Sequence, residues 1–312
     1  MLHLTRILFV TGLLALCLSF QPADQPADSP RDLPSRFPEA RRIVAIGDLH
    51  GDLAATRRVL GLAGAIDDKD HWIGGDLVLV QTGDQTDRGD GEQAILDLLV
   101  RLEKEAAAAG GAVHVLNGNH ELLNASLDFR YVTPGGLADF EDAVPRAAID
   151  SIPKSVEEPQ RARAAAFQPG GPYARVLAAR NTIVIIGQNV FVHGGVRPEH
   201  IDYGIDRIND EVRSWLSGEG PRPEFVDSRR GPTWTRLYSS NPDTAACDTL
   251  TLVLERLSAK RMIVGHTIQE GGIAPFCGGK LWGIDVGMSA FSGGKPQALE
   301  IAGDSVRVIR ED

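Results

Sequence analysis

The sequence predicts an α/β protein with a parallel sheet at its core, and two observations support this prediction. Short apolar runs rich in Ile and Val, at 42–46, 77–81 and 112–116, alternate with segments of helical periodicity at 53–63 and 91–109. Runs that are apolar at every position indicate strands buried on both faces, as in parallel sheets. Each run also ends in polar residues, at the edge of the sheet where open α/β folds bind ligands.

The composition is that of an ordinary globular protein. The chain has 312 residues, of which 43% are hydrophobic and 24% charged, so it can bury a large core as one catalytic domain or two smaller ones. The net charge of −10 argues against a nucleic-acid partner, because binding to phosphate backbones needs clustered Lys and Arg. An acidic chain instead favours metal cations.

The first 40 residues are predicted to lie outside the folded domain. Residues 1–20 combine Arg6 with an apolar run over 7–20, which is too short to span a bilayer comfortably and is typical of a secretory signal. We therefore expect export to the periplasm or medium, with no membrane span. A lipid anchor at Cys17 is the less favoured alternative, because Leu16 is too large for a lipoprotein box.

Residues 21–40 are predicted to form a disordered tether, since five prolines occur between 21 and 38 and little is available to bury. The catalytic domain is then expected over 41–312, as a monomer.

Within that domain, each element has its own signal. Leu53, Thr56 and Val59 keep helical spacing after the first loop, and Asp90 is expected to cap the second helix, which ends at 110–111. Between about 122 and 180 the pattern becomes Ala-rich and helical, broken by Pro and Gly, with no strand signal. This segment is predicted to be a helical insert over the ligand-binding edge of the sheet.

Strand signals return after the insert. They cover 182–186, 190–193, 262–264 and 281–286, followed by a hairpin over 298–309 that turns at Gly303 and Asp304.

Six candidate metal ligands follow these strands. They are carboxylates, an amide and imidazoles, a set suited to hard or borderline divalent ions: Asp48, His50, Asp84, Asn119, His193 and His266. Three strands that point at one place can hold two ions. Asp84 is the expected bridge, because one carboxylate offers two oxygens to ions roughly 3.5–4 Å apart. Such a pair acidifies a shared water and clamps a phosphoryl group during in-line attack.

These residues lie in five ordered motifs that resemble those of the calcineurin-like metallophosphoesterases. The motifs are Gly47-Asp48-Leu49-His50-Gly51, Gly83-Asp84-Gln85-Thr86-Asp87-Arg88-Gly89, Gly118-Asn119-His120-Glu121, His193-Gly194-Gly195 and Gly265-His266. Within this family the chain is similar to the phosphoprotein phosphatases, and Gly231 to Arg236 and Asp285 to Ser289 resemble their Shewanella-like bacterial and plant members. The resemblance implies a β-sandwich core of the metallophosphoesterase type, with flanking helices and the helical insert over the active site.

The resemblance also implies a role for each residue. Asp48, His50 and Asp84 would hold one ion, and Asp84, Asn119, His193 and His266 the other, with Mn, Fe or Zn as the metals. His120 would be the general acid, with its ring held by Asp87. Arg88 and Arg236 would bind phosphate oxygens through their guanidinium forks. For Arg236 a structural ion pair is the alternative.

One departure from the family refines the prediction. Many distant metallophosphoesterases end in Gly-His-x-His, but here His266 is followed by Thr267 and Ile268, which favours the protein-phosphatase branch. The expected reaction is hydrolysis of phosphorylated side chains of proteins, or of small phosphoesters, by a metal-bridging hydroxide. The alternatives are a nucleotide or dinucleoside-polyphosphate hydrolase, and a secreted binding scaffold with an inactive site. The sequence leaves open whether Cys247 and Cys277 form a disulfide.

Overall fold

The computed structural model describes residues 33–311, so the predicted signal peptide and most of the predicted tether lie outside the described residues. Over 33–311, no helix is both long and apolar enough to cross a membrane. The tether prediction is wrong at its carboxyl end. Residues Arg36–Phe37 form strand β1, which pairs in parallel with β5, and Ser35 is buried. The fold therefore begins before residue 41.

The three predicted parallel strands form one side of a five-stranded sheet in the order β11-β10-β2-β3-β4. The strands are β2 (Ile43–Ile46), β3 (Val78–Gln81), β4 (Ala112–Val115), β10 (Gln297–Ala302) and β11 (Ser305–Arg310). Strands β2, β3 and β4 run parallel, with Val44 opposite Leu79 and Leu79 opposite Val113. The predicted hairpin adds β10 antiparallel to β2, so this sheet is mixed and not purely parallel.

The strands after the insert form a second sheet of six strands in the order β1-β5-β6-β7-β9-β8. They are β5 (Ile183–Ile186), β6 (Asn189–Val192), β7 (Arg261–Val264), β8 (Ala274–Phe276) and β9 (Leu281–Gly283), together with β1. Strands β6, β7 and β9 are parallel. Strand β9 is shorter than the predicted 281–286, and the sequence pattern did not indicate β8.

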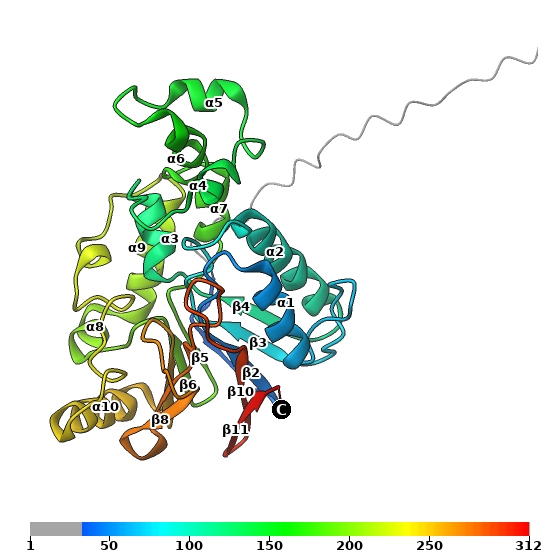
Figure 1. Ribbon diagram of the computed structural model, residues 1–312. Coiled ribbons are helices and arrows are strands. Elements are labelled where there is room, and N and C mark those ends of the chain that lie inside the picture. Colours follow the sequence, from blue (N-terminus) through cyan, green and yellow to red (C-terminus); the bar gives the residue numbers. More distant parts are fainter. Residues whose placement is uncertain (1–32, 312) are drawn as a thin grey trace, which may run out of the picture.

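The two sheets pack face to face, and strand β5 shows how. Val184 and Ile186 join the core shared with the first sheet, whereas Ile183 and Ile185 face the opposite side and pack with residues of the helices there. Helices α1 (Leu53–Leu62) and α2 (Glu92–Ala108) cover the first sheet. Helices α8 (Pro198–Tyr203), α9 (Ile205–Leu216) and α10 (Thr244–Leu257) lie beside the second (Figure 1). The predicted sandwich with flanking helices is confirmed.

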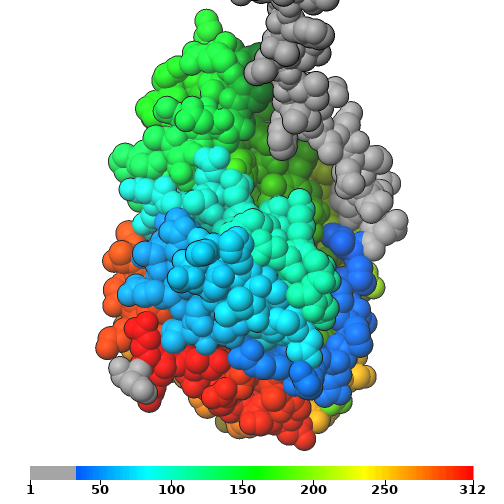
Figure 2. Space-filling model, turned by 90° about the vertical axis from the view of Figure 1, so that its right-hand side faces the viewer, coloured from blue at the N-terminus to red at the C-terminus, as the bar shows by residue number. Residues whose placement is uncertain are grey.

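The stretch of sequence between β4 and β5 is helical, as predicted. It contains α3 (Asn119–Ala125), α4 (Pro134–Ala138), α5 (Arg146–Ser151), α6 (Arg161–Phe167) and α7 (Pro172–Ala178), plus the short 3₁₀ turn η2 (Glu158–Gln160). The insert packs around a separate apolar core, in which the rings of Phe140, Phe167 and Tyr173 contact one another and to which α2 and α9 also contribute. It stands at one end of the sandwich, as both views show (Figures 1 and 2).

Two local features complete the fold. Helix α2 begins after Gly91, and Asp90 does not cap it, contrary to the prediction, because the carboxylate of Asp90 accepts a hydrogen bond from Thr133 in the insert. The carboxylate of Asp139, also in the insert, instead accepts the backbone N–H of Gln93 at 2.7 Å. A disulfide joins Cys247 in α10 to Cys277 in the 3₁₀ turn η4 (Cys277–Gly279). It closes a loop that contains His266, which lies two residues after the end of strand β7 (Arg261–Val264).

Candidate active site

The six predicted metal ligands come together where five strands end. Asp48 and His50 follow β2, Asp84 follows β3 and Asn119 follows β4, all in the five-stranded sheet. His193 and His266 follow β6 and β7 of the other sheet. The site is therefore built across both sheets, at their carboxyl edges.

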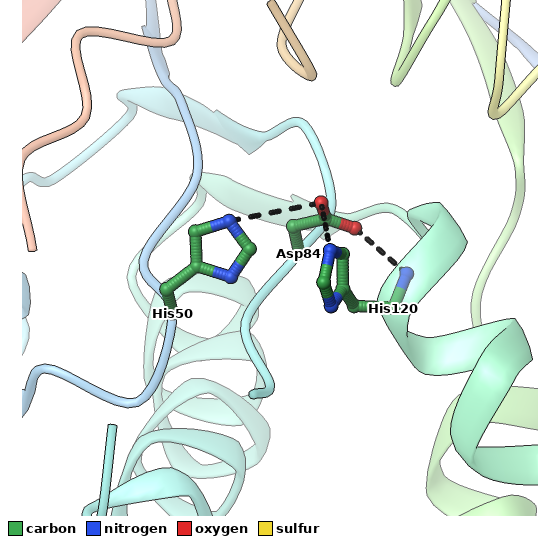
Figure 3. A group of neighbouring side chains, drawn as sticks. All are labelled: His50, Asp84 and His120. Carbon is green, nitrogen blue, oxygen red and sulfur yellow. Dashed lines mark hydrogen bonds and ion pairs between the residues drawn. The ribbon is translucent and has the colours of Figure 1, made fainter. Parts of the chain in front are cut away.

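Asp84 lies at the centre of the group. Its Oδ2 is 3.8 Å from Nε2 of His50 and 3.1 Å from Nε2 of His193. Figure 3 shows its carboxylate between the side chains of His50 and His120. Two clusters with metal-binding spacing share Asp84: one with His50 and His120, the other with His193 and His266. This is the arrangement expected of a bridging carboxylate.

Asp48 and Asn119 complete these clusters. Asp48 Oδ2 lies 3.9 Å from His50 Nε2, and its two oxygens accept the backbone N–H of His266 at 3.2 Å. Asn119 Oδ1 lies 3.0 Å from Nε2 of His193. All six predicted ligands are buried.

Glycines let the loops approach this closely. A Cβ at Gly118 would sit 2.2 Å from Asp84 Oδ1, and one at Gly265 would sit 2.4 Å from Asp48 Oδ1. Neither carboxylate could keep its place beside a larger residue. Close packing against these carboxylates therefore requires glycine at both positions, in the Gly-Asn-His motif and in the Gly-His motif.

The tautomers of the histidines fit metal ligation. Nδ1 of His50 donates to the carbonyl of Thr86 at 3.0 Å, and Nδ1 of His193 donates to that of Thr82 at 2.9 Å. The Nε2 lone pair of each ring then points into the site. His266 is held the other way round, because its Nε2 donates to the Trp234 carbonyl at 3.0 Å and leaves Nδ1 free.

The charges also fit bound cations. Burial, with the nearby carboxylates of Asp285 and Asp84, raises the pKa of Asp48 well above its usual range. Burial lowers the pKa of His50 to about 3, so this imidazole is neutral and can bind metal. Divalent ions would stabilise this group of crowded carboxylates, which face neutral imidazoles.

His120, a member of the first cluster, is hydrogen-bonded to Asp87, as predicted for the acid and the residue that holds its ring. Nδ1 of His120 lies 2.6 Å from Asp87 Oδ2, and its Nε2 lies 3.7 Å from Asp84 Oδ2. Burial alone would lower the pKa of His120, but the charges of Asp84 and Asp87 raise it above its ordinary value. A raised pKa suits a histidine that must carry a proton.

The two predicted phosphate-binding arginines lie at different parts of the site. The guanidinium of Arg88 contacts Nε2 of His50 at 2.6 Å and Nε2 of His120 at 3.2 Å. Arg236 donates to the carbonyl of His266 and, at 3.0 Å, to the hydroxyl of Thr267. Arg236 therefore braces the His266 loop while its charge stays near the site.

Glu121 is a structural residue of the site to which the sequence analysis gave no role. Its buried carboxylate accepts the backbone N–H groups of Asp84, Gln85, Thr86 and Gly118 at 2.7 to 3.1 Å. It thereby fixes the loop after β3 against the start of α3. Its place in the Gly-Asn-His-Glu motif was the available signal. Asn124, Arg163 and Asp285 were also missed, because their roles depend on contacts that span the chain.

Comparisons with known proteins agree with this geometry. The family described as calcineurin-like phosphoesterase matches residues 41–270. Shewanella-like protein phosphatase 2 of Arabidopsis thaliana is 42% identical over 308 residues, covering 88% of this chain and 79% of that protein. Shewanella-like protein phosphatase 1 of Plasmodium berghei is 30% identical over 282 residues, covering 86% and 74%.

Among solved structures, the cold-active protein-tyrosine phosphatase of a psychrophilic Shewanella species has a similar fold. The TM-score is 0.72 at 24% identity, with 92% of this chain and 87% of that chain covered. The chain therefore belongs to the calcineurin-like phosphoesterases, among the Shewanella-like protein phosphatases, and is a metal-dependent phosphatase.

Proposed function

We propose that the protein is a two-metal phosphatase that removes phosphate from protein side chains. The observation that carries the proposal is the position of Asp84, whose carboxylate is shared by two buried clusters, one of which includes His120 with Asp87 hydrogen-bonded to its ring. An inactive binding scaffold would have no need to keep this arrangement.

Six of the site residues would hold the metal ions. Asp48, His50 and Asp84 would hold one ion, and Asp84, Asn119, His193 and His266 the other. When bound, the ions supply an acidified water and positive charge for the phosphoryl oxygens. We propose Mn, Fe or Zn, because oxygen and imidazole donors suit them.

The remaining side chains act on the substrate. His120 gives its proton to the leaving alcohol oxygen, and Asp87 holds the ring in the tautomer that allows this. Arg88 and Arg236 bind phosphate oxygens and orient the ester for in-line displacement.

A groove beside the site supports a protein substrate. It has a volume of about 800 Å³, and its lining includes Tyr131, Trp215, Trp234 and Arg229. The Tyr131 ring lies 5.0 Å from that of His120, and the Trp234 ring 5.9 Å from that of His266, so two residues of the groove wall adjoin the site. Aromatic walls with charged side chains, three arginines and two aspartates, suit the residues that flank a phosphorylated side chain. The names of the two relatives agree with this substrate class.

A substrate panel tests the proposal. Metal-reconstituted protein should hydrolyse phosphotyrosine, phosphoserine or phosphothreonine peptides with a higher kcat/KM than dinucleoside polyphosphates. His120→Asn should keep its metal and lose roughly 10²–10⁴-fold in kcat on phosphoserine peptides. A clear preference for the nucleotides would establish the alternative hydrolase. Full metal content with no turnover on either class would indicate a binding scaffold.

We also propose that the protein is exported. The signal-like segment 1–20 motivates this, and the Cys247–Cys277 disulfide supports it, since such bonds persist in oxidising compartments. Cell fractionation should recover a mature chain that lacks residues 1–20 outside the cytoplasm. A full-length cytoplasmic chain with two free thiols would contradict export.

A further inference from the structure

One arginine of the helical insert is fully buried and reaches the catalytic pair. Arg163 lies in α6, and its side chain has no solvent exposure. Its NH2 donates to Asp87 Oδ1 at 3.1 Å and to Glu92 Oε2 at 2.5 Å. Its Nε donates to Asn124 Oδ1 at 2.7 Å, and its NH1 to the carbonyl of Gly136 at 2.8 Å. Every nitrogen of the guanidinium is thus used.

These contacts fix the carboxylate of Asp87 completely. Oδ2 of Asp87 faces His120 Nδ1 at 2.6 Å, while Oδ1 accepts from Arg163 and, at 2.8 Å, from Asn124 Nδ2. Asp87 is itself fully buried, so bulk solvent does not reach its carboxylate. The orientation of the His120 ring therefore depends on Asp87, and that of Asp87 depends on Arg163.

The charges of the buried groups also indicate that Arg163 positions Asp87. Asp87 and Glu92 are two buried carboxylates close together, and Arg163 is the cation between them. Its guanidinium also lies 5.1 Å from the ring centres of both Phe140 and Phe167, in the core of the insert. Desolvating a guanidinium is costly, and an apolar residue could fill such a core as well or better. A need to position Asp87 would explain why a charge is kept here.

We propose that Arg163 is a positioning residue for proton transfer, through which the helical insert holds the Asp87–His120 pair in its working geometry. The inference rests on the proposed role of His120. It gives the insert a part in the chemistry beyond shaping access to the site.

Comparison of good and poor leaving groups tests this directly. Arg163→Met should lower kcat by roughly 10–100-fold on a phosphoserine peptide, whose alkoxide must be protonated, as is usual when the hydrogen-bonding support of an active-site residue is removed. On p-nitrophenyl phosphate, whose leaving group needs no proton, the loss should stay below about 3-fold. Metal content should not change. Arg163→Lys, which keeps the charge but not the fork, should fold readily and show an intermediate loss with the same dependence.

Arg213→Met is the matched control. Arg213 is also a buried arginine of a helix, α9, but it donates to Asn181 and Asp210, away from the catalytic pair. This variant should lose stability and show no leaving-group dependence. In an Asp87→Asn background, Arg163→Met should add no further dependence, because the two residues act in series.

Three results would overturn the inference. They are equal losses on both substrates for the Arg163 variants, additive effects with Asp87→Asn, or a leaving-group dependence in Arg213→Met. His120→Asn, measured in parallel, separates the causes. If it shows the dependence and the Arg163 variants do not, only this inference fails. If His120→Asn itself loses activity equally on both substrates, the acid role of His120 fails and the inference fails with it.

Discussion

Several residues of the site are held in backbone conformations that side chains normally avoid. His50, Asp84, Asp87, Arg88 and His266 all have positive φ, between 46° and 67°. Each costs of the order of 1 kcal/mol or more for a residue with a side chain. The surrounding hydrogen bonds must hold these loops in place against this cost. The strained conformations direct the side chains into one small volume.

The choice of site residues was largely readable from the sequence. Asp48, Asp84 and His193 could be found because each follows an apolar run at the edge where strand ends meet. Arg163 could not, because its helix gives only an Ala-rich pattern and its partners lie as far away as Asp87 in the sequence. A residue that acts through long-range contacts leaves no local signal.

Glu121→Gln should weaken both the fold and the site. An amide can accept on one side only, so some of the backbone N–H groups now bound by the carboxylate would face an N–H₂ group. We expect a loss of about 2–4 kcal/mol in the free energy of unfolding, together with weaker metal binding through Asp84. Denaturant unfolding and elemental analysis measure the two effects.

Glu158→Gln is the control for this change, since Glu158 is an exposed glutamate that pairs with Arg161 at 3.2 Å. It should alter unfolding by well under 1 kcal/mol. If Glu121→Gln were no less stable than this control, Glu121 would not hold the loops together.

Among the helices and strands, the longer elements were predicted from the sequence pattern, whereas the shortest were not. Strands β2, β3, β4 and the β10–β11 hairpin appear where the pattern placed them. Strand β1 has two residues, which is too few for any periodicity, and it was assigned to the tether. The start of α2 was misplaced because Asp90 binds Thr133, a partner some 40 residues away that no local rule reveals.

His114 should make stability depend on pH. It lies in β4, with its ring 4.3 Å from that of Phe37 in β1, and burial lowers its pKa to about 4. The unfolded chain, with a pKa near 6.5, binds the proton more tightly, so this contribution to stability is complete above about pH 6.5 and is lost as pH falls toward 4. The loss should be of the order of 2–3 kcal/mol.

His114→Phe should remove that part of the pH dependence while keeping the contact with Phe37. The free energy of unfolding, measured from pH 4 to 8, should fall less steeply toward acid in this variant than in the wild type. His71→Gln, at an exposed loop position, should follow the wild-type curve. Equal slopes for His114→Phe and wild type would show that His114 is not the titrating group.

In the molecule as a whole, the site is built from residues of both sheets. The five-stranded sheet supplies Asp48, His50, Asp84 and Asn119, and the six-stranded sheet supplies His193 and His266. Sequence patterns alone predicted the parallel strands but not that a second sheet would pack on the first. Which sheets face each other depends on core complementarity between distant segments, and that expectation came from the family resemblance.

Because the ligands span both sheets, removing metal should destabilise the entire fold. A ligand present at about 100 times its Kd stabilises the native state by about 2.7 kcal/mol per site, which in a domain of this size corresponds to several degrees in Tm. Chelated protein should therefore melt several degrees below reconstituted protein in calorimetry. An unchanged Tm would mean that no metal links the sheets.

The sharpest test of the two-metal site is Asp84→Asn, which removes the carboxylate that two ions would share. Elemental analysis of purified protein should find about two divalent ions per wild-type chain and fewer in the variant, whose turnover should fall by several orders of magnitude. Asp76→Asn, an exposed acid paired with Arg41, should match wild type in both respects. Two tightly held ions with normal turnover in Asp84→Asn would contradict the bridged dimetal site.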